Sequence, residues 1–412
     1  MSRFLIFSLF TFSILSLILG FSFNEDLSSG GSRYDFYLTL NVIKNLANLS
    51  LVDYSEYTRH FPLHYFLLAV LYNLFNDDLF LRIIYLIFSS LFPIFLFLNL
   101  NLISKLNTKN ILFITAGILF LPFFRSSVIW PNSHLTAIIF FLIGNFFYLL
   151  GLSEKKIYKY LNLFFLSLAT YSVQTYAIFY MFYLFYYYKN SNFEEFGKLF
   201  LFCIFLSIPG FIFILSSEGE RSIYGLAFSK NLSFSLITNF SIIFFYYCFF
   251  IFNRENINSL KKSFLKIQKK EFFFLFLFFL INIYFYNKND SYIMLGSGFF
   301  YKLSIFLTQN ISLFFLSSFL GLFISLLIIK KDTKFLFILL LINIMSSHYL
   351  IYQKYFEPIF IIMILVLFKN FLSENVISSR KNTLIFISLI FVYYIVATVN
   401  SYLNISKSLL GS

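Results

Sequence analysis

The chain has 412 residues, of which 59% are hydrophobic, 24% aromatic and only 12% charged. About a quarter of the residues in an ordinary soluble domain are charged, so this composition excludes one. The net charge of +13 would suit a nucleic-acid-binding protein. However, most Lys and Arg residues gather in short segments between apolar runs, as the positive-inside rule expects. We therefore predict a membrane protein with no nucleic-acid partner.

The first apolar run, Phe4–Phe23, is long enough to cross a hydrocarbon core of ~30 Å. We interpret it as a first span with a cytoplasmic N-terminus, because Arg3 precedes it and it lacks a good cleavage site. The polar segment 23–78 then forms a long first outer loop. Within it, apolar residues at helical spacing predict a membrane-surface helix over Tyr34–Leu49. The run Leu63–Phe75 is short for a span and predicts a second interfacial helix.

The remaining apolar runs alternate with polar segments along the whole chain. They predict an all-α polytopic protein with about 13 transmembrane helices in a single transmembrane domain, 1–412, and no soluble domain. The later spans are predicted at Leu79–Ile103, Ile111–Phe124, Leu135–Leu152, two short helices within Tyr160–Tyr188, Leu199–Leu215, Phe234–Phe252, Phe272–Tyr286, Leu303–Ile329, Phe335–Ser346, Ile359–Phe368 and Leu384–Val399. Residues 125–134 are predicted as an outer turn and 254–270 as a basic inner loop.

The first outer loop carries an unusual share of the carboxylates. Asp35 follows Gly30-Gly31, which allow a tight turn before the surface helix. A carboxylate there could orient or deprotonate an acceptor hydroxyl, or hold a divalent metal ion. The alternative is that Asp35 only stabilises the first turn of its helix through the helix dipole. Between Phe23 and His60 the acidic residues of the loop are Glu25, Asp26, Asp35, Asp53 and Glu56.

Other polar residues are predicted on the same outer side. Arg59 and His60 precede Pro62 and could meet a phosphate, although an Arg beside a membrane helix also snorkels without a ligand. Asn132 and His134 lie in the second outer turn. A third group contains Gln353, Lys354 and Glu357, in which Lys354 could bind a lipid phosphate or pair with Glu357. We find no Gly-rich phosphate loop and no metal-spaced His/Cys set.

This layout resembles the GT-C class of integral membrane glycosyltransferases over residues 1–152. The resemblance rests on one N-terminal span, the acidic first outer loop, the short second outer loop and the aromatic-Pro-Leu helix HFPLHYFLLAVLYNLF followed by Arg82. It implies a polyprenyl-phosphate-linked sugar as donor. It also implies Asp35 as the catalytic acid of the first loop, with Glu25 and Asp26 as second choices, and Arg82 facing the lipid phosphate.

One departure from the family pattern concerns the second outer loop. Many members carry an acid there, whereas this chain has Asn132 and His134. Metal dependence, with a possible divalent metal ion as cofactor, therefore stays open.

The expected function is transfer of a sugar from a polyprenyl-phosphate carrier to a glycan or lipid acceptor in the cell envelope, outside a bacterial inner membrane. Fixed cations among Arg59, Arg82, Arg125 and Lys354 would stabilise the phosphate leaving group. Two alternatives are an O-antigen-type polymerase or ligase and a lipid-linked saccharide flippase. The polymerase class more often has its large outer loop in the second half of the chain. Transporters usually carry mid-membrane ionisable groups, which these spans almost lack.

Overall fold

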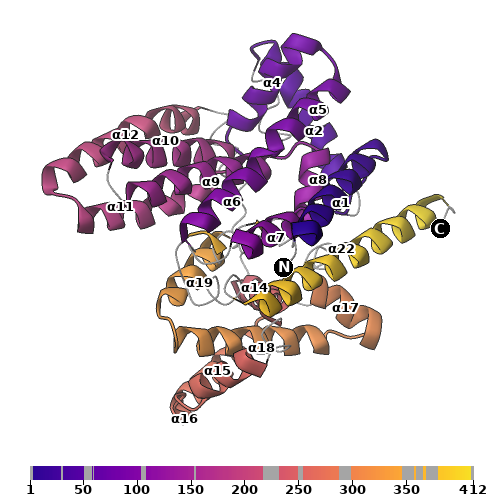
Figure 1. Ribbon diagram of the computed structural model, residues 1–412, viewed down its shortest axis with the longest axis vertical. Coiled ribbons are helices and arrows are strands. Elements are labelled where there is room, and N and C mark those ends of the chain that lie inside the picture. Colours follow the sequence, from indigo (N-terminus) through magenta and orange to yellow (C-terminus); the bar gives the residue numbers. More distant parts are fainter. Residues whose placement is uncertain are drawn as a thin grey trace. The chain divides into compact units, whose positions relative to one another are not determined.

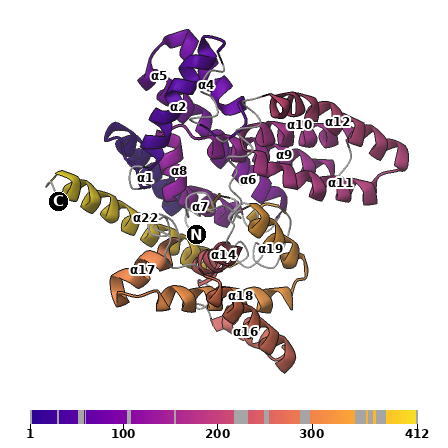
Figure 2. The ribbon, with the colours of Figure 1, turned by 180° about the vertical axis from the view of Figure 1, so that it is seen from behind.

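The computed structural model describes residues 3–28, 31–50, 58, 60–103, 108–152, 155–216, 232–248, 254–286, 298–345, 357–358, 365–367 and 379–409. Every regular element in these ranges is a helix, which confirms the all-α class. By packing, the chain divides into two compact units, Met1–Leu226 with Ile390–Ser412, and Ala227–Leu389. Figure 1 shows the helices of both units, and Figure 2 shows them from behind. That both belong to one transmembrane domain stays a prediction.

The first unit contains the N-terminal helices and the end of the C-terminal one. Within it, α9 packs against α6 and α10, α1 packs against α7, and α2 packs against α4. Its elements are α1 (Arg3–Ser22), α2 (Gly31–Ala47), α4 (Leu63–Phe75), α5 (Asp78–Ser89), α6 (Leu91–Ile103), α7 (Thr108–Ile118), α8 (Pro122–Ile129), α9 (Ser133–Gly151), α10 (Lys156–Ser172), η1 (Gln174–Ala177), α11 (Ile178–Asn190), α12 (Phe193–Leu215) and the later part of α22 (Arg380–Leu409).

The second unit is organised around the contact between α14 and α18. Ser318 Oγ donates a hydrogen bond to the Ile237 carbonyl, and the hydroxyls of Ser241 and Ser317 share one of 2.7 Å. A Cβ atom added at Gly321 would lie 1.9 Å from the Phe240 carbonyl oxygen. Small residues on α18 thus let the two backbones approach closely, as in many membrane helix pairs. The elements are α14 (Leu232–Tyr247), α15 (Arg254–Phe264), α16 (Lys269–Tyr284), α17 (Gly298–Thr308), α18 (Ser312–Ile329) and α19 (Lys334–Met345).

Six helices in the described ranges are long and apolar enough to span a membrane, and a seventh span results if α7 and α8, bent by 60°, count as one. The protein is therefore membrane-embedded, but 13 spans are not confirmed. With 12 residues, for example, α19 rises only ~18 Å, against the ~30 Å of a hydrocarbon core. The six are Phe4–Ser22, Asp78–Ile103, Ser133–Gly151, Phe193–Leu215, Ser312–Ile329 and Arg380–Ser401.

Two helices occupy the segment that the sequence predicted as the first outer loop. Helix α2 begins at Gly31 and ends at Ala47, close to the predicted range, and α4 has the predicted bounds. Phe36, Leu40 and Ile43 of α2 are buried at helical spacing, and α2 packs against α4 and α8. Their location at an outer membrane surface stays a prediction.

Three predicted boundaries were wrong. The outer turn expected over 125–134 is helical up to Ile129, because Pro122 occupies the first turn of α8, a position that its fixed φ favours. The basic inner loop expected over 254–270 contains helix α15. The span expected over 303–329 is interrupted between α17 and α18, where Gln309 adopts a left-handed φ of 55°. None of these three differences can be recognised from hydropathy alone.

Candidate functional site

Trp130, the only tryptophan of the chain, lies at the centre of the polar residues in the first unit. Its backbone is extended at the end of α8. The following Pro131 has no backbone N–H to donate, so it cannot extend the hydrogen bonds of that helix. The indole N–H donates a 3.0 Å hydrogen bond to the Glu25 carbonyl oxygen. The rings of Phe36 and Tyr37 on α2 lie 5.9 and 5.8 Å from it. Trp130 therefore joins α8, α2 and the segment that follows α1.

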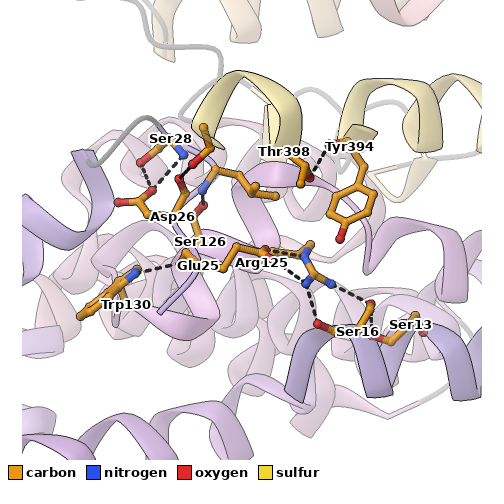
Figure 3. Close-up of polar contacts among 12 residues, drawn as sticks. Ser13, Ser16, Glu25, Asp26, Ser28, Arg125, Ser126, Trp130, Tyr394 and Thr398 are labelled. Atoms are coloured by element: carbon orange, nitrogen blue, oxygen red, sulfur yellow. Dashed lines mark hydrogen bonds and ion pairs between the residues drawn. The ribbon is translucent and has the colours of Figure 1, made fainter. Parts of the chain in front are cut away.

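A buried ion pair holds the segment after α1 against α8. Arg125 Nε and Nη2 bind the two Glu25 carboxylate oxygens at 2.7 and 2.8 Å, and the Arg125 side chain is completely buried. Its remaining N–H groups bind Ser16 Oγ and the Ser16 carbonyl, as Figure 3 shows. A Cβ atom at Gly20 would lie 2.7 Å from the Glu25 carboxylate. Both Glu25 oxygens are thus engaged, which favours a structural role over proton transfer.

Asp26 anchors the first turn of α2. Its Oδ2 accepts a 2.7 Å hydrogen bond from the Arg33 backbone N–H, and its Oδ1 accepts from the Ser28 N–H at 2.8 Å. Figure 3 shows Asp26 beside Ser28 and Ser126. The Asp26 carbonyl accepts a hydrogen bond from Ser401 Oγ on α22. This carboxylate satisfies backbone donors at a helix start, so it too has a structural function.

Arg82 is the most unusual cation of the site, because it is buried and forms no ion pair with a described carboxylate. Its guanidinium carbon lies 3.8 Å from the Trp130 ring centroid. Nε donates to the Ile129 carbonyl and Nη1 to Asn24 Oδ1, both at 2.9 Å. Nη2 is buried and meets no hydrogen-bond partner in the part of the chain that the structure describes. A buried donor without an acceptor is costly, so an anionic ligand that reached this edge of Arg82 would satisfy it.

A second arginine lies on the same aromatic ring. The Arg33 guanidinium carbon is 5.5 Å from the Trp130 ring and 5.9 Å from that of Tyr37, one turn further along α2. The Arg33 residue is exposed, and it forms no ion pair with a described carboxylate. Two cations around one indole, neither of them neutralised by a described acid, form an electropositive site suited to phosphate.

Asp35 lies near Tyr65 of α4. Burial raises the pKa of Tyr65 to about 12, and the negative charge of Asp35 adds to this rise. Thr58 Oγ1 donates to the Tyr65 hydroxyl at 2.8 Å. Asp35 itself is partly exposed, unlike the anchoring Asp26. It therefore has partial access to solvent and lies toward α4, whereas Arg33, two residues earlier on α2, lies toward Trp130.

Three of the four histidines gather beside this region. The His60 and His134 rings meet edge to face with centroids 4.9 Å apart, and His60 Nδ1 lies 3.4 Å from Gln174 Oε1. His64 Nδ1 lies 2.8 Å from Thr136 Oγ1. Burial, and secondarily the charge of His60, lower the pKa of His64 to about 3. His64 is therefore neutral at physiological pH and belongs to the packing of α4 on α9.

Asn132 serves mainly to begin α9. Its side chain accepts a hydrogen bond from the His134 backbone N–H at 2.9 Å, the usual pattern of a helix N-cap. Its carbonyl accepts from the Tyr85 hydroxyl at 2.8 Å. Asn132 thus orients the chain between Trp130 and His134.

The structure brings together most of the predicted site residues of the first unit. Arg59, Gln353 and Lys354 lie outside the described residues. Glu357 is fully buried in the second unit. The residues that do gather are Glu25, Asp26, Asp35, His60, Arg82, Arg125, Asn132 and His134.

The sequence prediction missed Arg33, Tyr37 and Asn24 and gave Trp130 no role. A signal existed for two of them. Trp130 is the only tryptophan among many aromatic residues, and Arg33 and Tyr37 are four residues apart, which places them on one helix face. The contact of Asn24 with Arg82 joins residues that no spacing rule relates.

The described residues contain no group of three His, Cys, Asp or Glu side chains that could hold a metal ion. Glu25 is engaged with Arg125 and Asp26 with backbone N–H groups. Among the described residues, the oxygen ligands that divalent cations need are therefore not gathered, and we assign no step to a metal. No family model, curated protein or solved structure matches this chain.

Proposed function

We propose that this protein is a membrane glycosyltransferase that moves a sugar from a polyprenyl-phosphate carrier to a glycan or lipid acceptor. The observation that carries the proposal is the Nη2 edge of Arg82, which lies beside Trp130 and Arg33 and has no partner among the described residues. Arg82 lies one turn inside the candidate span Asp78–Ile103. The phosphate of a lipid whose polyprenyl chain is embedded in the membrane would lie at this depth. The resemblance to the GT-C class over residues 1–152 agrees with this.

In the proposed reaction, the acceptor hydroxyl attacks the anomeric carbon and the bond from that carbon to the phosphate oxygen breaks. The phosphate leaves with the electron pair and gains negative charge. Arg82 Nη2 and the Arg33 guanidinium would bind this charge more strongly in the transition state than in the donor. The Ile129 and Asn24 oxygens fix the orientation of Arg82, so little reorganisation is needed.

The proton of the acceptor hydroxyl would pass to Asp35. Among the described carboxylates of the first outer loop, Glu25 faces Arg125 and Asp26 caps α2. Asp35 is partly exposed and lies two residues from Arg33. Its partial exposure, together with the first-loop acid that the GT-C resemblance implies, makes it our candidate for the base. The phosphate would then lie between Arg82 of α5 and Arg33 of α2, and the base would belong to α2.

The outer side of a bacterial inner membrane is the proposed location. A lipid-linked donor suits it, since the carrier supplies both the activated sugar and its membrane anchor. The N-terminus would lie in the cytoplasm, as the basic residues of the inner segments favour.

The test uses proteoliposomes with purified full-length protein, a panel of radiolabelled polyprenyl-phosphate sugars and an outer-envelope glycan fraction as acceptor. Wild type should release sugar from one donor. Asp35→Asn should lower the rate by about 100-fold or more, the usual size of a general-base effect. Asp78→Asn is the matched control, because Asp78 forms only a half-exposed 3.8 Å pair with Lys44, and it should keep full activity.

Other outcomes identify the alternatives. Movement of intact lipid across the bilayer without cleavage would indicate a flippase and overturn the transferase proposal. Joining of lipid-linked oligosaccharides with release of a pyrophosphate carrier would indicate a polymerase or ligase. Full transfer by Asp35→Asn would exclude Asp35 as the base while keeping the transferase.

A further inference from the structure

The segment from Arg254 to Lys270 in the second unit is strongly basic. It contains one carboxylate, Glu255, and six cations. All six cationic residues are exposed. None of them forms an ion pair within the described part of this unit. The cations are Arg254, Lys261, Lys262, Lys266, Lys269 and Lys270.

These charges lie at one end of the membrane-embedded helices of the unit. Lys330, directly after α18, pairs with Glu271 in the first turn of α16. Helix α15 packs against α18, with the Phe264 and Phe323 rings 6.0 Å apart. The start of α16 and the basic helix α15 are therefore at the level where the candidate span Ser312–Ile329 ends. If Ser312–Ile329 spans a membrane, its end would lie near the boundary between hydrocarbon and water.

Positive charge is crowded at this end. Burial lowers the pKa of Lys331, and the nearby charge of Lys262 lowers it further. Glu271 is already engaged by Lys330. Such a group of like charges is stabilised when an external anion lies against it.

Large apolar side chains are exposed among the same lysines. Phe264 is 51% and Ile257 44% exposed on α15, and Leu265, directly after this helix, is 75% exposed. A helix with a basic face and exposed apolar side chains is typical of one that lies in the membrane interface. We propose that α15 and the first turn of α16 form a binding surface for anionic phospholipid head groups.

A lipid surface explains both features of the segment. The lysines and Arg254 would contact lipid phosphates, and Phe264 and Leu265 would enter the boundary of the acyl chains. A soluble polyanion such as nucleic acid would neutralise the charges but leave these apolar side chains in water. This inference is independent of the proposed glycosyl transfer, because it concerns residues of the second unit alone.

The test is native mass spectrometry of the purified full-length protein with an equimolar mixture of phosphatidylglycerol and phosphatidylcholine that have the same acyl chains. Wild type should retain the anionic lipid in several-fold excess, and added salt should reduce the excess. The triple variant Lys261→Gln/Lys262→Gln/Lys266→Gln should retain both lipids about equally. The control Lys155→Gln/Lys156→Gln/Lys189→Gln removes three exposed lysines from the first unit and should keep the preference.

A second variant separates the apolar contribution. Leu265→Ser should lower total lipid retention while the remaining preference stays salt-dependent. Equal retention of the two lipids by wild type would overturn the proposal. So would an equal loss of preference in both triple variants, since the effect would then follow net charge alone. Stronger retention of a soluble polyanion, inositol hexaphosphate, than of phosphatidylglycerol would identify a different partner.

Discussion

The guanidinium of Arg82 lies against the face of Trp130, with 3.8 Å between the guanidinium carbon and the ring centroid. The indole N–H points to the Glu25 carbonyl, so one side chain fixes both a cation of α5 and the segment after α1. Cation–π contact leaves the guanidinium N–H groups free to bind in their own plane. Two of the three nitrogens meet oxygen acceptors of the protein. The third, Nη2, has no acceptor among the described residues, and it is the atom to which we propose that the phosphate binds.

Replacing Trp130 tests this arrangement through donor binding. Trp130→Leu removes a cation–π contact worth ~0.5–2 kcal/mol and should raise KM for the lipid-linked sugar by about tenfold, since each tenfold corresponds to ~1.4 kcal/mol. Trp130→Phe keeps an aromatic face and should raise KM less. Phe205→Leu, at a 68% exposed position of α12, is the control. Equal KM values for the Leu and Phe variants would contradict the contribution of the ring.

The single tryptophan also provides a binding signal. Adding polyprenyl phosphate to the purified protein should change the emission of Trp130, because a charge would then lie beside the ring that contacts Arg82 and Arg33. Polyprenol of the same length without phosphate should leave the emission unchanged. Arg82→Gln should reduce the response to the phosphate. A response to polyprenol as large as that to the phosphate would show that the hydrocarbon chain alone is detected.

Breaking the Glu25–Arg125 pair should destabilise the first unit strongly. Glu25→Ala leaves the fully buried Arg125 side chain without its counter-ion, and loss of one partner of a buried pair typically costs ~3–5 kcal/mol. The thermal midpoint, followed by Trp130 emission, should fall. The control is Glu194→Ala, because the Glu194–Lys198 pair is exposed, and exposed pairs contribute little. A similar shift for both variants would contradict the structural role of Glu25.

The sequence predicts the positions of helices better than it predicts the contacts between side chains. The length and hydropathy of the first run and the apolar spacing before and after Pro62 were sufficient to place α1, α2 and α4. These signals are local, so they are readable without the tertiary structure. Breaks that depend on a proline turn or on one left-handed residue, such as Pro122 and Gln309, do not change hydropathy and were missed.

The sequence predicted many of the residues of the candidate site, but it did not predict what each of them contacts. Placing the outer segments on one side of the membrane was enough to group Asp35, Arg82 and His134. Glu25 and Asp26 looked equivalent to Asp35 because all three lie in one acidic segment. Their difference comes from partners distant in sequence, such as Arg125, which no local pattern encodes.

Acidification should destabilise the protein through His64. Burial lowers its pKa from 6.5 in the unfolded chain to about 3 when folded. The unfolded state therefore binds the proton first, and stability present above about pH 6.5 is lost as the pH falls toward 3. At about pH 5 the loss should be ~2 kcal/mol. His64→Asn, which keeps a partner for Thr136, should show a smaller fall in thermal midpoint between about pH 7 and pH 5. Equal falls would show that other groups cause the acid sensitivity.

Gly321 should be intolerant of a methyl group, because a Cβ atom there would lie 1.9 Å from the Phe240 carbonyl oxygen and 3.2 Å from the Phe244 nitrogen. Both neighbours are backbone atoms of α14, so relief requires the two helices to separate. Separation would lengthen the hydrogen bonds that Ser317 and Ser318 make to α14. Gly321→Ala should therefore lower the thermal midpoint and increase proteolysis of the second unit.

In Gly197→Ala the new Cβ meets nothing within 4 Å, so this control adds a methyl group at a helical glycine without a clash. The control should match wild type or exceed it slightly, since Ala favours the helix over Gly. An unchanged midpoint in Gly321→Ala would mean that α14 and α18 are not in this close contact in the membrane.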